Sequence, residues 1–352
     1  MVKLFQARPR PGFDSLPLKP LSAGDLLDLA VRIYRREAIQ LIRIALLPGL
    51  VSYAGVILFS IGFNNFSTMR GDERVLITAV LIATGVLFYL TGKVLFYALL
   101  GGASRSLFDH VVGRAPDGDD AGSGHLFRVG EVYRAVRGRL GALLGAILLL
   151  VLLGAFAATI LYLVLAVLAV GYVAIHITFL KALPLSIQII CGSLVGLLLF
   201  AGLIWSGLLL FRRFVCVPQI LLVEERGVFA AIGRSFALGG SISHIGALLL
   251  FWFFTDWSIW VLLILPVAWY GYLEGIEINP FNPEGPLWYL ITQQTLSQLS
   301  QIIVAPVALV GFALLYLDTR VRMEGFDVEL LAQRILSPPN RDAACPQGGR
   351  EP

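Results

Sequence analysis

The chain is short of charge for its length. Only 14% of its 352 residues are Asp, Glu, Lys or Arg, whereas soluble proteins carry roughly 25%. Apolar residues make up 57%, above the roughly 45–50% of soluble proteins. Part of the surface must therefore face something other than water. This composition excludes a disordered chain, a collagen-like chain and a coiled-coil rod, and it favours several membrane crossings.

Residues that build metal sites and disulfides are also scarce. The three cysteines, Cys191, Cys216 and Cys345, are an odd number without paired spacing, which argues against a disulfide framework or a zinc site. There is no phosphate-binding glycine loop, metal-ligand set or nucleophile–base motif. The basic residues form no nucleic-acid recognition motif. We therefore expect no cofactor, no catalytic centre and no nucleic-acid partner.

Long apolar runs are what the chain does contain. A spanning helix needs about 20 mostly apolar residues to cross a hydrocarbon core of about 30 Å. Six runs meet this requirement: Ala38–Phe63, Val75–Leu100, Gly141–Ile175, Leu185–Phe211, Ile245–Tyr272 and Leu287–Leu317. They are continuous, whereas the strands of a membrane barrel would alternate apolar and polar residues. The predicted fold is an all-α bundle of six transmembrane helices.

The basic residues predict the orientation of this bundle. All 27 lysines and arginines except Arg70, Arg74 and Lys181 lie near one side of the predicted spans. The positive-inside bias then makes both termini cytoplasmic. No cleavable signal is recognised, so the first span is expected to direct insertion. We divide the chain into a flexible N-terminus at 1–20, a membrane domain at 21–336 and a disordered tail at 337–352.

A repeat of about one hundred residues divides the membrane domain. Tyr34, Tyr133 and Phe236 each lie beside arginine and shortly before a span. The predicted unit is an amphipathic helix at the membrane interface, followed by a two-helix hairpin. Ser22 and Asp25 match a Ser-x-x-acid start signal for the first such helix. The alternative is that any cytoplasmic segment leading into a span is basic and aromatic.

The arginines of these units are expected to bind anionic lipid headgroups at the membrane surface. The predicted interfacial anchors are Arg32, Arg35, Arg36, Arg134, Arg137, Arg212, Arg213, Arg234, Arg320 and Arg322. Small residues predict close helix packing within the third and fourth spans, where Gly141 precedes Gly145 and Gly192 precedes Gly196 by four residues.

Two charged residues lie where the hydropathy pattern does not call for them. Asp256 falls near the middle of the fifth span, where an acid costs about 2.5–3.5 kcal/mol on insertion scales. It is either a protonatable or cation-pairing site, or a structural acid. Lys93 lies at comparable depth in the second span and is a candidate partner. The alternative is that Lys93 extends to the inner interface.

The sixth span begins with a polar stripe. Gln294, Ser297, Gln298 and Gln301 recur at helical spacing and share one face. The stripe either lines a hydrated cavity or pairs with neighbouring helices. A third interpretation is that the helix starts outside the membrane and spans only from about Leu299. Asp256, Lys93, Gln294, Gln298 and Gln301 form the candidate intramembrane polar site.

Three segments resemble a known family. They are PLKPLSAGDLLDLAVRIYRR from Pro17, VPQILLVEERGVFAAIGRSFAL from Val217 and LLYLDTRVRMEGFDVELLA from Leu314. The chain resembles bacterial six-helix proteins of the glycerophosphoryl diester phosphodiesterase membrane-domain family. The resemblance implies a multi-pass protein of the bacterial plasma membrane.

The hydrolase activity in that family name is not expected here. The catalytic barrel of those enzymes begins with a His-Arg-Gly signature, and none of the four histidines is followed by arginine. The residues after the sixth span are also far fewer than the ~250 of such a barrel.

Two functions remain as hypotheses. The first is a non-enzymatic membrane protein that organises or assists membrane-protein partners or lipids. The alternative is a transporter of a small solute, ion or lipid that uses Asp256 and the glutamine stripe. A continuous polar cavity that joins these residues would favour transport, and a dry, lipid-facing bundle would favour organisation. An intramembrane enzyme is third, since the apolar spans offer no catalytic pair.

Overall fold

The computed structural model describes residues 20–68, 72–112, 126–178, 182, 184–275, 286–326, 328 and 332. Nine helices form this part of the chain: α1 Ala23–Thr68, α2 Asp72–Val112, α3 Val129–Gly138, α4 Leu140–Thr178, α5 Leu185–Phe214, α6 Val217–Val223, α7 Val228–Leu238, α8 Ile242–Leu273 and α9 Leu287–Glu324. Six of them are long and apolar enough to cross a membrane, which confirms the predicted fold class. The predicted flexible terminus and tail, apart from residue 20, lie outside the described residues.

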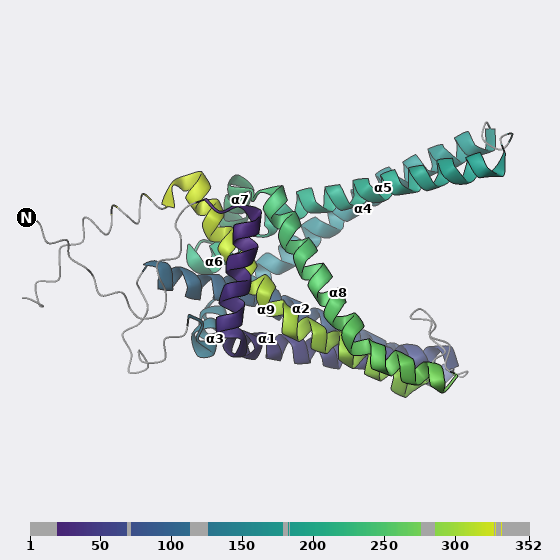
Figure 1. The fold of residues 1–352 in the computed structure, drawn as a ribbon, viewed down its shortest axis with the longest axis horizontal. Coiled ribbons are helices and arrows are strands. Elements are labelled where there is room, and N and C mark those ends of the chain that lie inside the picture. The colour runs from purple at the N-terminus through teal and green to yellow at the C-terminus, as the bar shows by residue number, and fades with distance from the viewer. Residues whose placement is uncertain are drawn as a thin grey trace, which may run out of the picture.

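Helix α1 consists of two parts that meet at Glu37, whose backbone is not helical (φ −109°, ψ 18°). The first part lies across the direction of the spans (Figure 1), and the second begins at Ala38, the predicted start of the first span. Ser22 and Asp25 start the first part as predicted. The amide of Asp25 donates to Ser22 Oγ at 3.2 Å, and the amide of Ser22 donates to the Asp25 carboxylate at 3.3 Å.

The same arrangement occurs twice more. Helix α3 precedes the α4–α5 hairpin and ends at a break at Arg139 (φ −130°, ψ 22°). Helix α7 precedes the α8–α9 hairpin and ends at Gly239, whose left-handed backbone (φ 37°) favours glycine. The three breaks lie about one hundred residues apart. The described residues therefore contain the predicted unit, a short helix followed by a hairpin, three times.

Hydroxyl groups connect these three units in a ring. Each short helix donates a side-chain hydroxyl to a backbone carbonyl of the hairpin that precedes it in circular order. The bonds join Tyr34 to Ile303, Tyr133 to Ile44 and Ser235 to Arg213, at 3.0, 2.8 and 2.7 Å. The first short helix is thus held by the last hairpin, which is what a three-fold repeat closed into a ring requires.

Two prolines, one inside α1 and one in the first turn of α6, each leave a carbonyl without a donor, and a tyrosine hydroxyl supplies the missing bond. Pro48 lacks an N–H, so the carbonyl of Ile44, four residues earlier, loses its helical donor. The Tyr133 hydroxyl donates to that carbonyl instead. A second case involves Pro218, the carbonyl of Phe214 and the hydroxyl of Tyr97, at 3.1 Å. In both cases a buried polar group that the proline leaves unpaired is satisfied from a neighbouring element.

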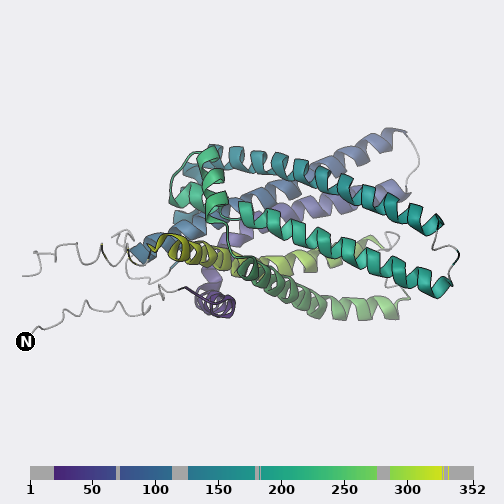
Figure 2. The same cartoon turned by 90° about the horizontal axis from the view of Figure 1, so that it is seen from above.

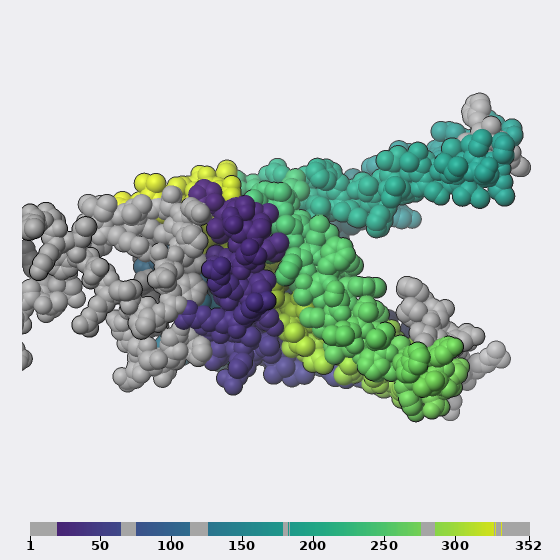
Figure 3. Space-filling model, viewed as in Figure 1, coloured from purple at the N-terminus to yellow at the C-terminus, as the bar shows by residue number. Residues whose placement is uncertain are grey.

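The buried core lies at one end of the bundle. We call this the core end; it contains α3, α6, α7 and the first part of α1, and the six long helices extend from it to the far end (Figures 1 and 2). Core residues from all three units meet here, among them Ile33, Leu107, Leu143, Leu221 and Tyr316. Toward the far end α1, α2, α8 and α9 stay together, whereas α4 and α5 project away with open space between them and α8 (Figure 3).

Glycines set the close contact between α1 and α2. A Cβ atom at Gly55 would lie 2.3 Å from the backbone nitrogen of Tyr89, and one at Gly85 would lie 2.5 Å from that of Phe59. The two backbones touch only because neither glycine has a side chain. By contrast, nothing lies within 4 Å of a Cβ at Gly141 or Gly196, so the predicted packing role of these two glycines is wrong.

Candidate functional site

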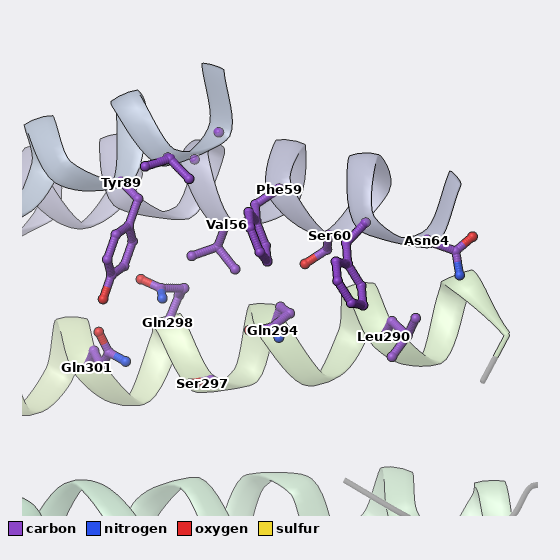
Figure 4. Close-up of a pocket in the computed structure, with 14 residues that line it drawn as sticks. Val56, Phe59, Ser60, Asn64, Tyr89, Leu290, Gln294, Ser297, Gln298 and Gln301 are labelled. Atoms are coloured by element: carbon purple, nitrogen blue, oxygen red, sulfur yellow. The ribbon is translucent and has the colours of Figure 1, made fainter. Parts of the chain in front are cut away.

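The glutamine stripe of α9 faces a cavity of about 610 Å³ between α9 and the α1–α2 hairpin. The cavity is lined by Gly55, Val56, Phe59, Ser60, Phe63, Asn64, Gly85, Val86, Tyr89, Leu290, Gln294, Ser297, Gln298 and Gln301. In the close-up, Tyr89 of α2 and Gln301 of α9 point toward each other, and Gln298 extends from α9 into the space beneath the hairpin (Figure 4). The stripe thus lines a cavity, and its hydration stays a prediction. We call this space the glutamine cavity.

The glutamine cavity runs along the helices and opens at the surface of the bundle. Its lining on α9 extends from Leu290 to Gln301, which at 1.5 Å per residue is about 16 Å. That length is roughly half of a hydrocarbon core of about 30 Å. Several lining side chains are also exposed, including Phe59 at 40%, Phe63 at 45% and Tyr89 at 38%. The groove is therefore about half as long as a hydrocarbon core is thick, and the glutamines of α9 give it polar groups along an otherwise largely apolar lining.

Lys93 lies at the deep end of this groove. Its ammonium group donates a hydrogen bond to Gln301 Oε1 at 3.0 Å and lies 5.1 Å from the centre of the Tyr89 ring. The side chain is half-buried. None of the ion pairs among the described residues involves Lys93. The structure thus places Lys93 with the glutamine stripe and not in a salt bridge with Asp256.

Asp256 contacts α9 at the residue next to Gln301. Ser300 Oγ lies 2.7 Å from the Asp256 carboxylate and 3.0 Å from its backbone carbonyl, and Ser300 is fully buried. Asp256 does not line the glutamine cavity, and it does not line a smaller pocket that Ser52, Lys93 and Trp252 help to form beside it. Of the five residues of the candidate site, Lys93, Gln294, Gln298 and Gln301 come together, and Asp256 holds α8 against the adjacent face of α9.

A small pocket of about 50 Å³ shares Gln298 and Gln301 with the glutamine cavity. Ser52 of α1, Lys93 of α2 and Trp252 of α8 complete its polar lining. The indole Nε1 of Trp252 is buried and has no hydrogen-bond partner among the described residues. A polar pocket of this size has room for water or for a small polar group. Sequence reasoning missed Ser52 and Trp252, because nothing in their own spans marks either as polar lining.

The ten predicted anchor arginines fall into two groups. Five are exposed on the first part of α1 and on α3: Arg32, Arg35, Arg36, Arg134 and Arg137. Their role at anionic headgroups stays a prediction. The other five lie at hairpin exits and on α7: Arg212, Arg213, Arg234, Arg320 and Arg322. Among the described residues, all of these except Arg212 have a bond within the protein. The charges of those four help to hold the core end together.

Arg234 shows how this second group is used. It pairs with Glu224 at 3.2 Å and also with Glu324, so α7 is tied to the ends of α6 and α9. Burial by itself lowers the pKa of Arg234, but the two carboxylates raise it above its ordinary value. At the start of α1 the amide of Leu21 donates to Asp318 of α9 at 2.8 Å, and Arg322 pairs with the same carboxylate.

Comparisons with known proteins add no relative: no protein family, curated protein or solved structure matches the chain. The resemblance to the phosphodiesterase membrane-domain family therefore stays a prediction. Among the described residues, no group of three or more His, Cys, Asp or Glu could hold a metal ion.

Proposed function

We propose that this integral membrane protein assists the movement of lipids, by accepting a lipid headgroup in the glutamine cavity and letting it descend into the bilayer. The observation that carries the proposal is a groove, about half as long as a bilayer core is thick, that is lined in part by glutamines and opens at the surface of the bundle. A headgroup that enters hydrocarbon loses its hydrogen bonds to water, at a cost of several kcal/mol. Gln294, Gln298 and Gln301 offer replacement bonds along that path.

The walls of the groove favour a lipid over a water-soluble solute. Phe59, Phe63 and Val86 line the cavity and are 40–45% exposed at the bundle surface. In a bilayer this exposed apolar rim would contact acyl chains, so a lipid could stay in the membrane while its headgroup enters the groove. With the predicted orientation, the groove opens in the outer leaflet and the core end lies in the cytoplasm. The plasma membrane as its location stays a prediction.

Organisation of membrane-protein partners is the second candidate. It is favoured by the α4–α5 hairpin, which stands apart from the other spans and leaves residues such as Phe156, Tyr162 and Val167 67–71% exposed. Lipid covers such a surface as well as a partner helix does, so this observation carries less weight than the polar groove.

Lipid movement in proteoliposomes tests the proposal. The vesicles contain a phospholipid with a fluorescent dye on its acyl chain, and dithionite bleaches the dye only in the outer leaflet. We expect bleaching beyond half of the signal with the wild type. We expect it to be about two- to tenfold slower with Gln298→Leu, which removes one hydrogen-bonding group worth about 0.5–1.5 kcal/mol.

Gln188→Leu is the matched control, because it makes the same substitution in α5, away from the cavity. It is expected to leave the rate unchanged. A wild-type rate no higher than that of protein-free vesicles would remove the proposal and leave partner organisation as the better candidate.

A further inference from the structure

A second cavity borders Lys93 from the opposite side. It has a volume of about 450 Å³, within the range of small-molecule sites, and lies between α2, α4 and α5. Apart from Lys93 and Tyr97 its lining is apolar; Leu90 and Val94 of α2 face Ile147 and Val151 of α4 and Leu210 of α5. We call this the apolar cavity.

Lys93 is the residue that the two spaces share. It lines the apolar cavity and the small polar pocket, and its ammonium group bonds to Gln301 on the polar side. Leu90, Lys93, Val94 and Tyr97 follow helical spacing on α2, so they form one face toward α4 and α5. A polar site and an apolar site thus meet at one cationic side chain, which is the geometry that a molecule with a charged head and an apolar tail requires.

The polar side offers donors that suit an anion. An ammonium group has three N–H donors and no acceptor, and Gln301 uses one of them. The indole of Trp252 can only donate, and its buried Nε1 has no partner among the described residues. Lys93 and Trp252 both line this pocket, and N–H donors of which one is cationic are complementary to a carboxylate. The pocket of about 50 Å³ is also small, which favours a compact head over a bulky phosphodiester.

We infer that Lys93 and Trp252 bind the carboxylate of a single-chain amphiphile, such as a long-chain fatty acid, whose chain occupies the apolar cavity between α2, α4 and α5. The inference rests on the proposed lipid-handling function and names the class of ligand that the deep end of the groove selects. One chain is proposed because the apolar cavity, which Lys93 also lines, has a volume of about 450 Å³. The other polar groups at the head are Gln298 and Ser52, which can donate to a carboxylate as well.

Photocrosslinking in liposomes tests the inference. The probe is palmitate with a diazirine on its chain, and the comparison probe has the same chain and diazirine but ends in an alcohol. With the wild type we expect adducts of the palmitate probe on α4 and α5 around Val151 and Leu210, displaced by excess palmitate. The alcohol probe is expected to label these positions at least about tenfold less, because a hydrogen bond to a charged group is worth about that factor or more.

Substitutions can test the site of the carboxylate and the site of the chain separately. Lys93→Gln should lower palmitate labelling about tenfold while keeping a side chain that can bond to Gln301, and Lys93→Arg should restore most of it because the charge returns. Val151→Trp should fill the apolar cavity and lower labelling by both probes. Leu163→Trp, on an exposed position of α4, should change neither. Thermal melting of each variant identifies any that fail to fold.

Equal labelling by the two probes, or unchanged palmitate labelling in a folded Lys93→Gln protein, would overturn the inference. The proposed function would survive that result if Gln298→Leu still slowed phospholipid movement. If Lys93 governs palmitate labelling but phospholipid movement is absent, the ligand class stands and the phospholipid activity falls.

Discussion

The α1–α2 and α4–α5 hairpins hold equivalent places in the three-fold repeat, yet they pack in opposite ways. The α1–α2 pair is joined through Gly55 and Gly85, where the backbones touch, and α9 lies against it. The α4–α5 pair contains the most apolar segment of all six spans, but its helices are mostly exposed. In the most apolar window of the span that contains α5, no residue is buried. In the corresponding window of α9, 83% of the residues are buried.

This difference follows from the solvent. In water the most apolar helix is the most buried one, because burial removes apolar surface from water. In a bilayer, acyl chains are as apolar as leucine, so a leucine-rich helix gains nothing from leaving lipid. Helices associate there where small residues permit close approach or where polar groups need partners. The α1, α2 and α9 helices have both features. The outer parts of α4 and α5 contain small residues such as Gly154 and Gly196, but no neighbouring atom lies within 4 Å of a Cβ at either glycine, and few polar side chains there need partners.

Gly85→Leu should lower the stability of the protein more than any other change considered, because it disrupts the contact between α1 and α2. Its first side-chain carbon would lie 2.5 Å from the backbone nitrogen of Phe59, so α1 and α2 must separate. Overpacking of this kind costs about 1–3 kcal/mol, and more where backbone cannot move. We expect most of the monodisperse protein in detergent to be lost and the thermal midpoint to drop strongly. Both are measured by fluorescence-detected gel filtration, before and after heating.

Gly154→Leu is its control. Gly154 lies inside α4, and nothing is found within 4 Å of the position its Cβ would take. The variant should express and melt like the wild type. Equal loss in the two variants would show that α4 and α5 are packed in the membrane as tightly as α1 and α2.

The sequence predicts the six spans of this bundle, but it does not predict which glycines form helix contacts. The six spans follow from apolar run length, and the break at Glu37 coincides with the start of the first predicted span. The glycine prediction failed at Gly141 and Gly196 because spacing shows where a backbone could be approached and not by which helix. The glycines that do pack, Gly55 and Gly85, each need the other helix beside them, which one span cannot reveal.

The candidate site shows a similar limit. The sequence placed Lys93, Asp256 and the glutamines at a similar depth, and in the structure Lys93 bonds to Gln301 while Asp256 bonds to the adjacent Ser300. The direction in which each side chain of α9 faces around the helix axis decides which groups meet. The position of a residue along its span does not give that direction. Ser300 and Gln301 are adjacent in sequence but point about 100° apart on a helix of 3.6 residues per turn, so Asp256 reaches Ser300 and Lys93 reaches Gln301.

Water access should distinguish the two regions next. In a chain with all three cysteines replaced by alanine, Gln298→Cys would place a thiol in the glutamine cavity and Leu163→Cys would place one on the exposed face of α4. Thiolate formation needs water, so a membrane-impermeant maleimide should label the cavity thiol at least about tenfold faster. Labelling is measured in intact proteoliposomes by the mass shift of the protein. Equal protection of both thiols would show that the cavity is dry.

Tyr133→Phe should have a smaller effect, on the ring contact between α3 and α1. The hydroxyl donates at 2.8 Å to the Ile44 carbonyl that Pro48 leaves without a helical donor. Leaving that carbonyl unpaired costs about 1–3 kcal/mol if it is fully buried, and we expect the lower end because Tyr133 is only half-buried. Tyr162→Phe in α4, at a residue that is 70% exposed, should leave the thermal midpoint unchanged. Equal shifts in both variants would contradict the assigned bond.

The thermal midpoints of the same two variants can also be compared as a function of pH, where we expect the smallest difference. Burial raises the pKa of the Tyr133 phenol from its ordinary value of 10.0 to about 12. The folded state therefore holds this proton more tightly than the unfolded state does, so the contribution of the neutral phenol is complete below about pH 10 and is lost as the pH rises through about 12. The thermal midpoint of the wild type should exceed that of Tyr133→Phe at pH 8, and the gap should close between pH 10 and 12. The gap between the wild type and Tyr162→Phe should stay constant over that interval, because Tyr162 is 70% exposed on α4. A constant gap for Tyr133→Phe as well would mean that α3 does not bury this hydroxyl against α1.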